Sequence, residues 1–337
     1  MSASLSKARF EPKPYHPFYP LAWLLRSLRF RHPRQDLPSF SACPDSPDPN
    51  LSGSGLSMSN SAGRITARPR QILQAVFLDV DGTLLDGNHP DLSPSTFDAL
   101  RSLQKRGIKV ALNTSWGMAS VLSVPGLAKF PFDGYILAGG GEIYDHKRRL
   151  LERQTYIPAD LKAIFDQCKA MNIPVFFNNQ KPNLTLWTEE SKRFARKYHL
   201  FPLQIKDWSG EDITMITVID SDPEKIARIL EAAPGVYQVS AGSINQDLYP
   251  EGVSKGAGIK KMLEAWHLEG ACFVAVGDSK ADESMFEQAA LRIAMPWAQS
   301  STIEASDFVC EDHGQDTIAY ALKGCGLLAA LPESRRK

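Results

Sequence analysis

The sequence lacks net charge, a regular set of cysteines and any long apolar run. Its 337 residues hold 38 Lys and Arg and 38 Asp and Glu, which gives a formal net charge of zero. The balance is uneven, because residues 1–70 carry 10 Lys and Arg against 4 Asp and Glu, a net of +6, and the rest carries −6. A mildly acidic body gives no reason to expect nucleic acid as a partner.

The cysteines are odd in number, widely spaced and without a C-x-x-C pair: Cys43, Cys168, Cys272, Cys310 and Cys325. This pattern argues against a disulfide framework or a zinc site and suits a reducing compartment. No stretch approaches the roughly 18 consecutive apolar residues of a membrane span. We therefore expect a cytoplasmic protein without a membrane span.

Residues 1–70 are predicted to be a disordered or targeting extension. They contain 10 of the 23 prolines and 12 serines, and residues 52–61 form a low-complexity linker. Four leucines recur at helical spacing between residues 21 and 28, beside arginines. Two interpretations stay open. In the first, residues 1–35 form a basic amphipathic helix for organellar targeting or for binding a membrane surface. In the second, translation starts at Met58 and the preceding residues are a start-site artefact.

The remaining residues predict an α/β fold, a doubly wound parallel-sheet (Rossmann-like) core with an inserted α+β cap domain. Apolar runs bounded by turn signals indicate buried strands. The core strands are expected at residues 75–78, 108–112, 135–138, 271–276, 292–295 and 308–310. The core helices are expected at residues 92–107, 254–267 and 316–331. Alternating strands and helices imply parallel strands with right-handed crossovers, so residues 71–141 and 250–331 are assigned to one core.

Residues 142–249 change character and are predicted to form the cap domain. Its short strands are expected at residues 142–144, 175–178, 213–220, 236–240 and 244–249, and its helices at 158–171, 188–197 and 222–233. Gly139 to Gly141 and Pro250 to Gly252 are the expected hinges of this insert. The glycine run has a second interpretation, a cradle whose backbone amides bind a phosphate, although it lacks P-loop spacing.

Two carboxylates, Asp79 and Asp81, follow the first strand of the core. Ligands of open α/β sheets bind beyond the carboxyl ends of the strands, so this is the expected place for a site. The repulsion between two such carboxylates is best relieved by a cation, and the hard Mg²⁺ ion prefers oxygen ligands. The simpler alternative is a polar turn in which Asp-Gly is ordinary turn chemistry.

Further polar residues are expected at the same edge of the sheet. Thr114 follows the second strand, Lys255 begins a helix, and Asp278 and Asp282 follow a later strand. Each has a simpler interpretation, with Thr114 as a helix cap, Lys255 as a solvated lysine and Asp278 as a turn residue. A lysine at a helix N-terminus opposes the helix dipole, however, and so invites an anion.

Together these residues supply what phosphoryl transfer needs, which is a nucleophile, a cation for the charged oxygens and a proton shuttle. Asp79 can act as the nucleophile, and Asp81 can protonate the leaving oxygen and then activate water. Asp278 can complete the Mg²⁺ site, with the later carboxylate supporting it from behind. Thr114 and Lys255 can bind the phosphoryl oxygens.

Four motifs resemble those of the haloacid dehalogenase-like hydrolases. They are D-V-D-G-T from Asp79 to Thr83, L-N-T-S from Leu112 to Ser115, G-V-S-K-G from Gly252 to Gly256, and G-D-S-K-A-D-E-S-M-F from Gly277 to Phe286. The resemblance covers residues 73–325. The insert between the second and third motifs is similar to that of the Cof-like subfamily of small-molecule phosphatases, whose α+β cap closes over the site.

The resemblance implies a role for each matching residue. The roles are catalytic for Asp79, Asp81 and Lys255, substrate-binding for Thr114, Ser115 and Lys255, and Mg²⁺-binding for Asp79, the Asp81 carbonyl and Asp278, with Asp282 in support. It also implies a small phosphorylated substrate.

Three departures from the Cof-like pattern lie on the substrate side of the site. Trp116 stands where an arginine usually follows the second motif, and Ala281 stands where an asparagine usually precedes Asp282. Pro296 to Ala298 replace the usual G-N-A after the next strand. Trp116 has two interpretations, stacking on a sugar or heteroaromatic ring or packing under the cap hinge.

The sequence thus predicts a Mg²⁺-dependent phosphatase that hydrolyses a small phosphorylated metabolite, such as a sugar phosphate, through an aspartyl-phosphate intermediate. Two alternatives remain. One is a phosphomutase of the same fold, and the other is a phosphate-ligand binding protein with weakened catalysis, which the departures favour.

Overall fold

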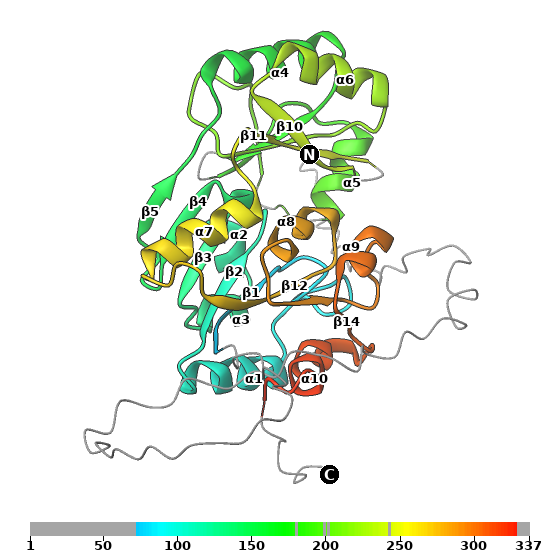
Figure 1. Ribbon diagram of the computed structural model, residues 1–337. Coiled ribbons are helices and arrows are strands. Elements are labelled where there is room, and N and C mark those ends of the chain that lie inside the picture. The colour runs from blue at the N-terminus through cyan, green and yellow to red at the C-terminus, as the bar shows by residue number, and fades with distance from the viewer. Residues whose placement is uncertain (1–71, 179–180, 198–199, 201–202, 242–243, 329–337) are drawn as a thin grey trace, which may run out of the picture.

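The computed structural model describes residues 72–328, apart from residues 179–180, 198–199, 201–202 and 242–243. The extension predicted at residues 1–70, with its amphipathic helix, lies outside the described residues. The described chain forms two β-sheets, each with its own helices (Figure 1). Among its helices, none is long and apolar enough to cross a membrane.

The first sheet has eight strands in the order β14-β13-β12-β1-β2-β3-β4-β5. Its parallel strands are β1 (Leu73–Leu78), β2 (Lys109–Asn113), β3 (Gly134–Leu137), β12 (Cys272–Gly277), β13 (Leu291–Ala294) and β14 (Phe308–Val309). Two antiparallel strands, β4 (Glu142–Asp145) and β5 (Leu150–Arg153), extend one edge. The predicted α/β class with a parallel core sheet is confirmed.

Helices cover both faces of this sheet (Figure 1). One face carries α1 (Pro94–Lys105), α2 (Met118–Ser123), α3 (Pro125–Lys129) and α10 (Thr317–Gly324). The other carries α7 (Lys255–Ala265), α8 (Glu283–Phe286) and α9 (Ser300–Ala305). The central strand β1 shows why two layers are needed. Val76 and Leu78 pack on the α1 side, whereas Ala75 and Phe77 pack on the α7 side, as the period-two alternation of strand side chains requires.

Local sequence signals set the helix boundaries. The side chain of Ser93 accepts a hydrogen bond from the Thr96 amide, and Pro94 occupies the first turn, so α1 begins at Pro94, within the range 92–107 that the sequence predicts. Helix α10 ends at Gly324, earlier than the predicted residue 331. Helices α2 and α3 were not predicted, because they have six and five residues and no side-chain cap.

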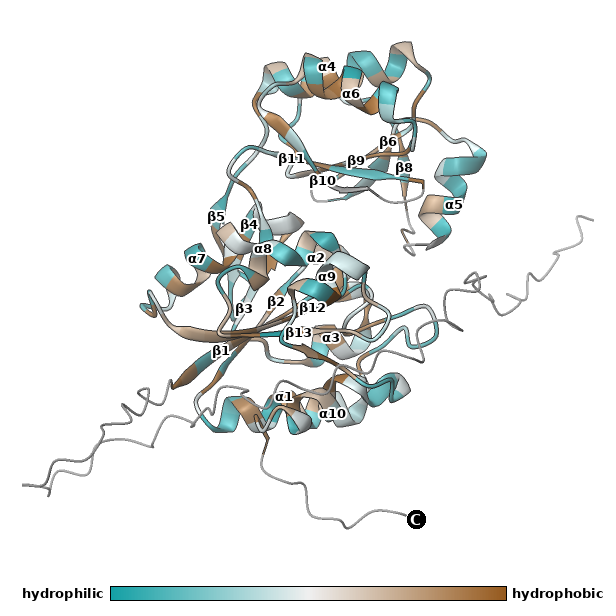
Figure 2. Cartoon of the chain, turned by 45° about the vertical axis from the view of Figure 1, so that its right-hand side comes forward, coloured by the Kyte–Doolittle hydropathy of each residue, from teal (hydrophilic) through white to brown (hydrophobic). Residues whose placement is uncertain are grey.

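The second sheet has six strands in the order β10-β11-β9-β6-β7-β8. The strands are β6 (Val175–Asn178), β7 (Pro182–Leu184), β8 (Gln204–Ile205), β9 (Met215–Val218), β10 (Val236–Ala241) and β11 (Gln246–Pro250). All neighbours pair antiparallel except β7 and β8. Helices α4 (Pro158–Ala170) and α6 (Pro223–Ala232) cover the face that points away from the first sheet, and α5 (Glu189–Lys197) lies on the other side (Figure 2).

The domain boundaries predicted at residues 142 and 249 stay a prediction, but β4 and β5, both inside the predicted cap, belong to the first sheet. Strand β4, at Glu142–Asp145, falls inside the predicted cap, yet it pairs with β3 and belongs to the eight-stranded sheet. The short alternation of apolar residues indicates a strand correctly but carries no information about its partner. The chain passes to the second sheet only after β5 and returns through β11, which leads directly to α7.

Candidate active site

Three neighbouring parallel strands end in the residues that the sequence singled out. Asp79 follows β1, Thr114 follows β2, and Asp278 follows β12, with β1 between the other two. The chain runs from β1 to β2 on one side and places β12 on the other, so the crevice at these strand ends is a topological switch point.

Lys255, the first residue of α7, lies at the centre of the site. Its Nζ donates to Asp79 Oδ1 at 2.7 Å and to Asp282 Oδ1 at 2.6 Å. The side chain is only 3% exposed. The interpretation of Lys255 as a solvated surface lysine is therefore wrong. Its ammonium bridges two buried carboxylates that are 203 residues apart in the sequence and that the fold brings together.

Asp282 holds the loop after β12 in place through hydrogen bonds. Its Oδ2 accepts hydrogen bonds from the Asp278 amide at 3.0 Å, the Ser279 amide at 2.9 Å and the Ser279 hydroxyl at 3.0 Å. With Oδ1 bonded to Lys255, both of its oxygens are engaged by donors. This supports the predicted place of Asp282 behind the metal site rather than among the metal ligands.

The turn after Asp79 packs directly against Asp278. Thr83 Oγ1 donates to Asp278 Oδ1 at 3.1 Å. Gly82 has φ of +85°, and a Cβ built there would lie 2.4 Å from Asp278 Oδ2. Only glycine satisfies both the backbone conformation and the close approach. The D-x-D-G-T motif therefore holds the loop after β1 against the loop after β12.

The electrostatics of the buried carboxylates are unfavourable without a cation. Burial raises the pKa of Asp79 to about 7; Lys255 opposes this rise and Asp282 adds to it. Burial raises the pKa of Asp278 well above its usual range, and the charges of Asp282, Asp79 and Asp81 raise it further. Burial alone would lower the pKa of Lys255, but Asp282 and Asp79 outweigh it and hold that pKa above its ordinary value.

These carboxylates fit a divalent cation. One oxygen each of Asp79, Asp278 and Asp282 lie within 4.8 Å of one another. Hard cations such as Mg²⁺ take carboxylate and carbonyl oxygens, and a cation here would relieve the repulsion that raises the two pKa values. Asp282 is already bonded through both oxygens, so Asp79 and Asp278 are the carboxylates that remain for the ion.

The structure also places the other predicted residues. Asp81 is exposed, in contrast to the buried Asp79, so the two carboxylates of the motif have different access to solvent.

Thr114 is fully buried, and its Oγ1 accepts from the Trp116 amide at 3.2 Å. It does not cap the next helix, because Gly117 is the N-cap residue of α2. Ser115 is half-buried in the same turn.

Trp116 packs inward. Its side chain is half-buried against the hydrophobic cluster on the α1 side of the sheet. Its carbonyl accepts from the Ala138 amide at 3.0 Å, which ties the loop after Thr114 to the end of β3. These contacts favour packing over the stacking interpretation.

The glycine run 139–141 serves close packing at the end of β3. The Gly139 amide donates to the Thr114 carbonyl and the Gly141 amide to the Ala138 carbonyl, so these two amides are not available to a phosphate. Gly139 has φ of +65°, and a Cβ there would lie 2.1 Å from the ring of Tyr249. The phosphate-cradle interpretation is therefore not supported.

Two buried polar atoms beside this packing have no hydrogen-bond partner among the described residues, the Tyr249 hydroxyl and Asn113 Oδ1. Burial raises the pKa of Tyr249 well above its usual range, and the charges of Asp247 and Asp79 raise it further. The Asn113 amide nitrogen donates to the Lys255 carbonyl at 2.9 Å. Neither residue was identified from sequence, because each is an ordinary strand residue there.

The second sheet comes close to the site. A Cβ built at Gly117 would lie 2.2 Å from the side-chain nitrogen of Asn178, at the end of β6. Strand β10 contacts the turn Lys280–Asp282. These approaches come from two strands of the second sheet, and they accord with the low exposure of Asp79, which is 4%.

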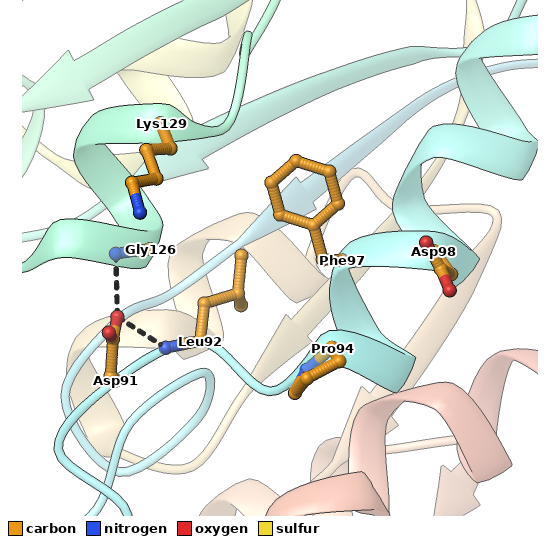
Figure 3. Close-up of a pocket in the computed structure, with 7 residues that line it drawn as sticks. All are labelled: Asp91, Leu92, Pro94, Phe97, Asp98, Gly126 and Lys129. Carbon is orange, nitrogen blue, oxygen red and sulfur yellow. Dashed lines mark hydrogen bonds between the residues drawn. The ribbon is translucent and has the colours of Figure 1, made fainter.

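A separate hollow of about 310 Å³ lies at the start of α1 (Figure 3). Asp91, Asp98 and Lys129 are exposed at it, and Asp91 Oδ1 already accepts from the amides of Leu92 at 2.8 Å and Gly126 at 2.7 Å. None of the site carboxylates lines it. The mixed charge and engaged carboxylate give this hollow no evident role in the chemistry.

Curated relatives align over most of their own lengths. The 5-amino-6-(5-phospho-D-ribitylamino)uracil phosphatase YwtE of Bacillus subtilis is 25% identical over 281 residues, covering 74% of this chain and 96% of that protein. The phosphoglycolate phosphatase of Methanoculleus marisnigri is 28% identical over 253 residues, covering 75% and 96%.

Solved structures share the fold. The subclass IIB sugar phosphatase BT4131 superposes with a TM-score of 0.68 at 22% identity, covering 76% of this chain and 100% of that chain. The sequence profile of the haloacid dehalogenase-like hydrolases matches residues 76–322, a span that contains all four motifs. The chain therefore belongs to the haloacid dehalogenase-like hydrolases.

Proposed function

We propose that this hydrolase is a Mg²⁺-dependent phosphatase that cleaves a small phosphorylated metabolite through an aspartyl-phosphate intermediate on Asp79. The observation that carries the proposal is the pairing of Asp79 with Lys255 beside Asp278, at the ends of adjacent parallel strands. Phosphoryl transfer depends chiefly on positioning and on positive charge around the transferred group. This arrangement supplies a carboxylate nucleophile, an ammonium and a pair of carboxylates for a metal ion.

The proposed roles follow from burial and contacts. Asp79 is held by Lys255 so that one oxygen faces the ammonium and the other remains for attack. Asp81 is exposed, as suits a residue that gives a proton to the leaving oxygen and takes one from the attacking water. Thr114 and Ser115 follow β2, Lys255 begins α7 and contacts Asp79, and these three residues would bind the phosphoryl oxygens.

Mg²⁺ would be held by Asp79, Asp278 and the Asp81 carbonyl, with Asp282 fixing the Asp278 loop. When bound, the ion neutralises carboxylate charge so that an anionic phosphate can approach. The same neutralisation keeps Asp79 ionised, and therefore nucleophilic, although burial raises its pKa.

We further propose that residues 142–249, except for the β4–β5 hairpin, act as a cap that selects the substrate. The approach of Asn178 to Gly117 supports this, because it puts a polar side chain of the second sheet beside the loop after Thr114. Asn178→Ala should change KM for the preferred substrate and leave kcat on a minimal aryl phosphate within about twofold. A large loss of kcat on every ester would place Asn178 in the catalytic machinery instead.

Sugar phosphates are the substrate class that we favour, on the strength of the sugar phosphatase among the structural neighbours. The test is release of phosphate from a panel of sugar phosphates, phosphoglycolate and aryl phosphates, with Mg²⁺ or with EDTA. Asp79→Asn should be inactive, while Asp166→Asn, an exposed aspartate of α4, serves as the matched control.

Each rival function has its own outcome in this assay. Isomerised sugar phosphate without free phosphate would identify a phosphomutase. Binding of phosphate with no turnover on any ester would identify a binding protein. Equal activity in Mg²⁺ and in EDTA would refute the metal dependence proposed here.

A further inference from the structure

The loop after β13 contacts both catalytic loops. Residues 296–298 are one of the three departures from the Cof-like pattern, and they precede α9. Trp297 is half-buried and packs against the hydrophobic cluster on the α1 side of the sheet. None of the proposed roles above involves this loop.

Trp297 bonds to the turn of the first motif. Its indole Nε1 donates to the Gly82 carbonyl at 2.7 Å. The other polar group of that peptide, the Thr83 amide, donates to the Val80 carbonyl at the longer distance of 3.3 Å. Gly82 has no Cβ to restrict the rotation of its backbone, so the Gly82–Thr83 peptide depends on hydrogen bonds to fix its plane. The bond from the Trp297 indole is the shorter of the two that this peptide makes.

The same loop also bonds to the last motif. The Gln299 amide donates to the Asp278 carbonyl at 2.8 Å, and Gln299 Oε1 accepts from the Lys280 amide at 3.2 Å. The segment from Trp297 to Gln299 therefore spans the gap between the loop after β1 and the loop after β12. These two loops carry the carboxylates proposed to bind the metal.

We propose that Trp297 is a positioning residue that holds the Gly82–Thr83 peptide in the orientation needed for metal binding and turnover. The proposal rests on the proposed function above. Rotation of this peptide would move Thr83 Oγ1 away from Asp278 Oδ1, to which it donates at 3.1 Å.

We call the bond from the Trp297 indole to the Gly82 carbonyl the brace. Its physical reason is the crowding at Gly82. The carboxylate of Asp278 lies so close to the Gly82 Cα that a methyl group would not fit. Two loops in such contact have little tolerance for displacement, and an error of about 1 Å in a catalytic group can cost 100-fold in rate. A donor that fixes the Gly82 carbonyl from outside keeps this contact without entering the site.

The test compares two matched tryptophan variants of the full chain. Trp297→Phe removes the indole N–H and keeps an aromatic ring. Trp208→Phe is the control. Trp208 lies in the predicted cap, where its ring stacks on Phe165 and its Nε1 donates to the Glu211 carbonyl at 2.8 Å. Both variants lose one indole-to-carbonyl bond, so a general effect on stability should be similar in the two.

Two readouts are needed, Mg²⁺ binding by isothermal titration calorimetry and steady-state kinetics on the best ester. Trp297→Phe should raise the Mg²⁺ dissociation constant about fivefold and lower kcat about tenfold, equal to about 1.4 kcal/mol, with KM changed less than twofold. Trp208→Phe should leave all three quantities within about twofold.

The outcomes separate this inference from the proposed function. Equal Mg²⁺ affinity and kcat in the wild type and Trp297→Phe would overturn the brace alone. An equal loss in both variants would also overturn it, since the effect would then be one of general stability. A wild-type chain that binds no Mg²⁺ would overturn the metal-dependent function together with the brace. Altered Mg²⁺ affinity in Trp297→Phe without any active ester would support the brace and refute the phosphatase.

Discussion

Replacing Asp79 with asparagine should abolish turnover and, without metal, stabilise the fold. The site holds the carboxylates of Asp79, Asp278 and Asp282 close together with one ammonium, that of Lys255. Asparagine removes one negative charge, and Lys255 keeps its 2.6 Å bond to Asp282. The variant therefore loses the nucleophile and also relieves the repulsion.

The size and sign of the effect follow from the pKa of Asp79. Burial raises it from 3.8 to about 7, so between these values the folded chain keeps a proton that the unfolded chain releases. The free energy of unfolding must then fall as the pH rises through this window. At ~1.4 kcal/mol per pH unit, the upper limit at pH 8 is ~4 kcal/mol. Because Asp278 can take up the proton in place of Asp79, we expect about 2 kcal/mol to be specific to Asp79.

The assay is thermal unfolding in EDTA from pH 4 to pH 8.5, followed by titration with Mg²⁺. The wild type should lose stability above pH 4 and regain it with Mg²⁺, whereas the Asp79→Asn variant should unfold about 4–8 °C higher than the wild type at pH 8 in EDTA. A variant that unfolds below the wild type in EDTA at pH 8 would refute the repulsion. Phosphate release within about tenfold of the wild type, or about 1.4 kcal/mol, would refute the nucleophile.

Three further substitutions test the neighbours of Asp79. Lys255→Met should lower the unfolding free energy at pH 8 by about 3–5 kcal/mol in EDTA, because it leaves two buried carboxylates without their cation; chemical denaturation checks it. Gly82→Ala should weaken Mg²⁺ binding at least tenfold in calorimetry, since the methyl group displaces the Asp278 carboxylate. Asp282→Asn should reduce both the unfolding temperature and the Mg²⁺ affinity, because the amide keeps only one acceptor oxygen and its NH2 group then faces either the Lys255 ammonium or the donors of Asp278 and Ser279. Unchanged Mg²⁺ affinity in the last two variants would contradict the assigned metal site.

The core of the fold could be predicted because its signals are local. The run from Ala75 to Leu78 is continuous and apolar, as a strand covered on both faces must be, and β1 extends over it and two residues more. The N-cap Ser93 marks the start of α1 in the same way, whereas α10 ends at Gly324, before the predicted residue 331. Strand β4 shows the limit, because its residues indicate a strand while its partner, β3, follows from the path of the chain.

The same distinction between local and long-range signals separates the site residues that the sequence predicted from those that it missed. The motif residues could be found because each follows a strand or begins a helix. The Trp297 bond to Gly82 joins residues 215 positions apart and has no counterpart in any local pattern. Tyr249 was missed for a similar reason, since its close approach to Gly139 joins β11 to the segment after β3, which lie far apart in the sequence.

The features of this site that cost stability have one explanation in common. Lys255 places a positive charge at the N-terminal end of α7, against the helix dipole. Burial and mutual repulsion raise the pKa of both Asp79 and Asp278. A divalent cation would relieve the repulsion between the carboxylates, and an anionic phosphate would be attracted by the lysine at the helix end. A fold that carries these unfavourable terms in one crevice is therefore stabilised by the ligands that its proposed reaction requires.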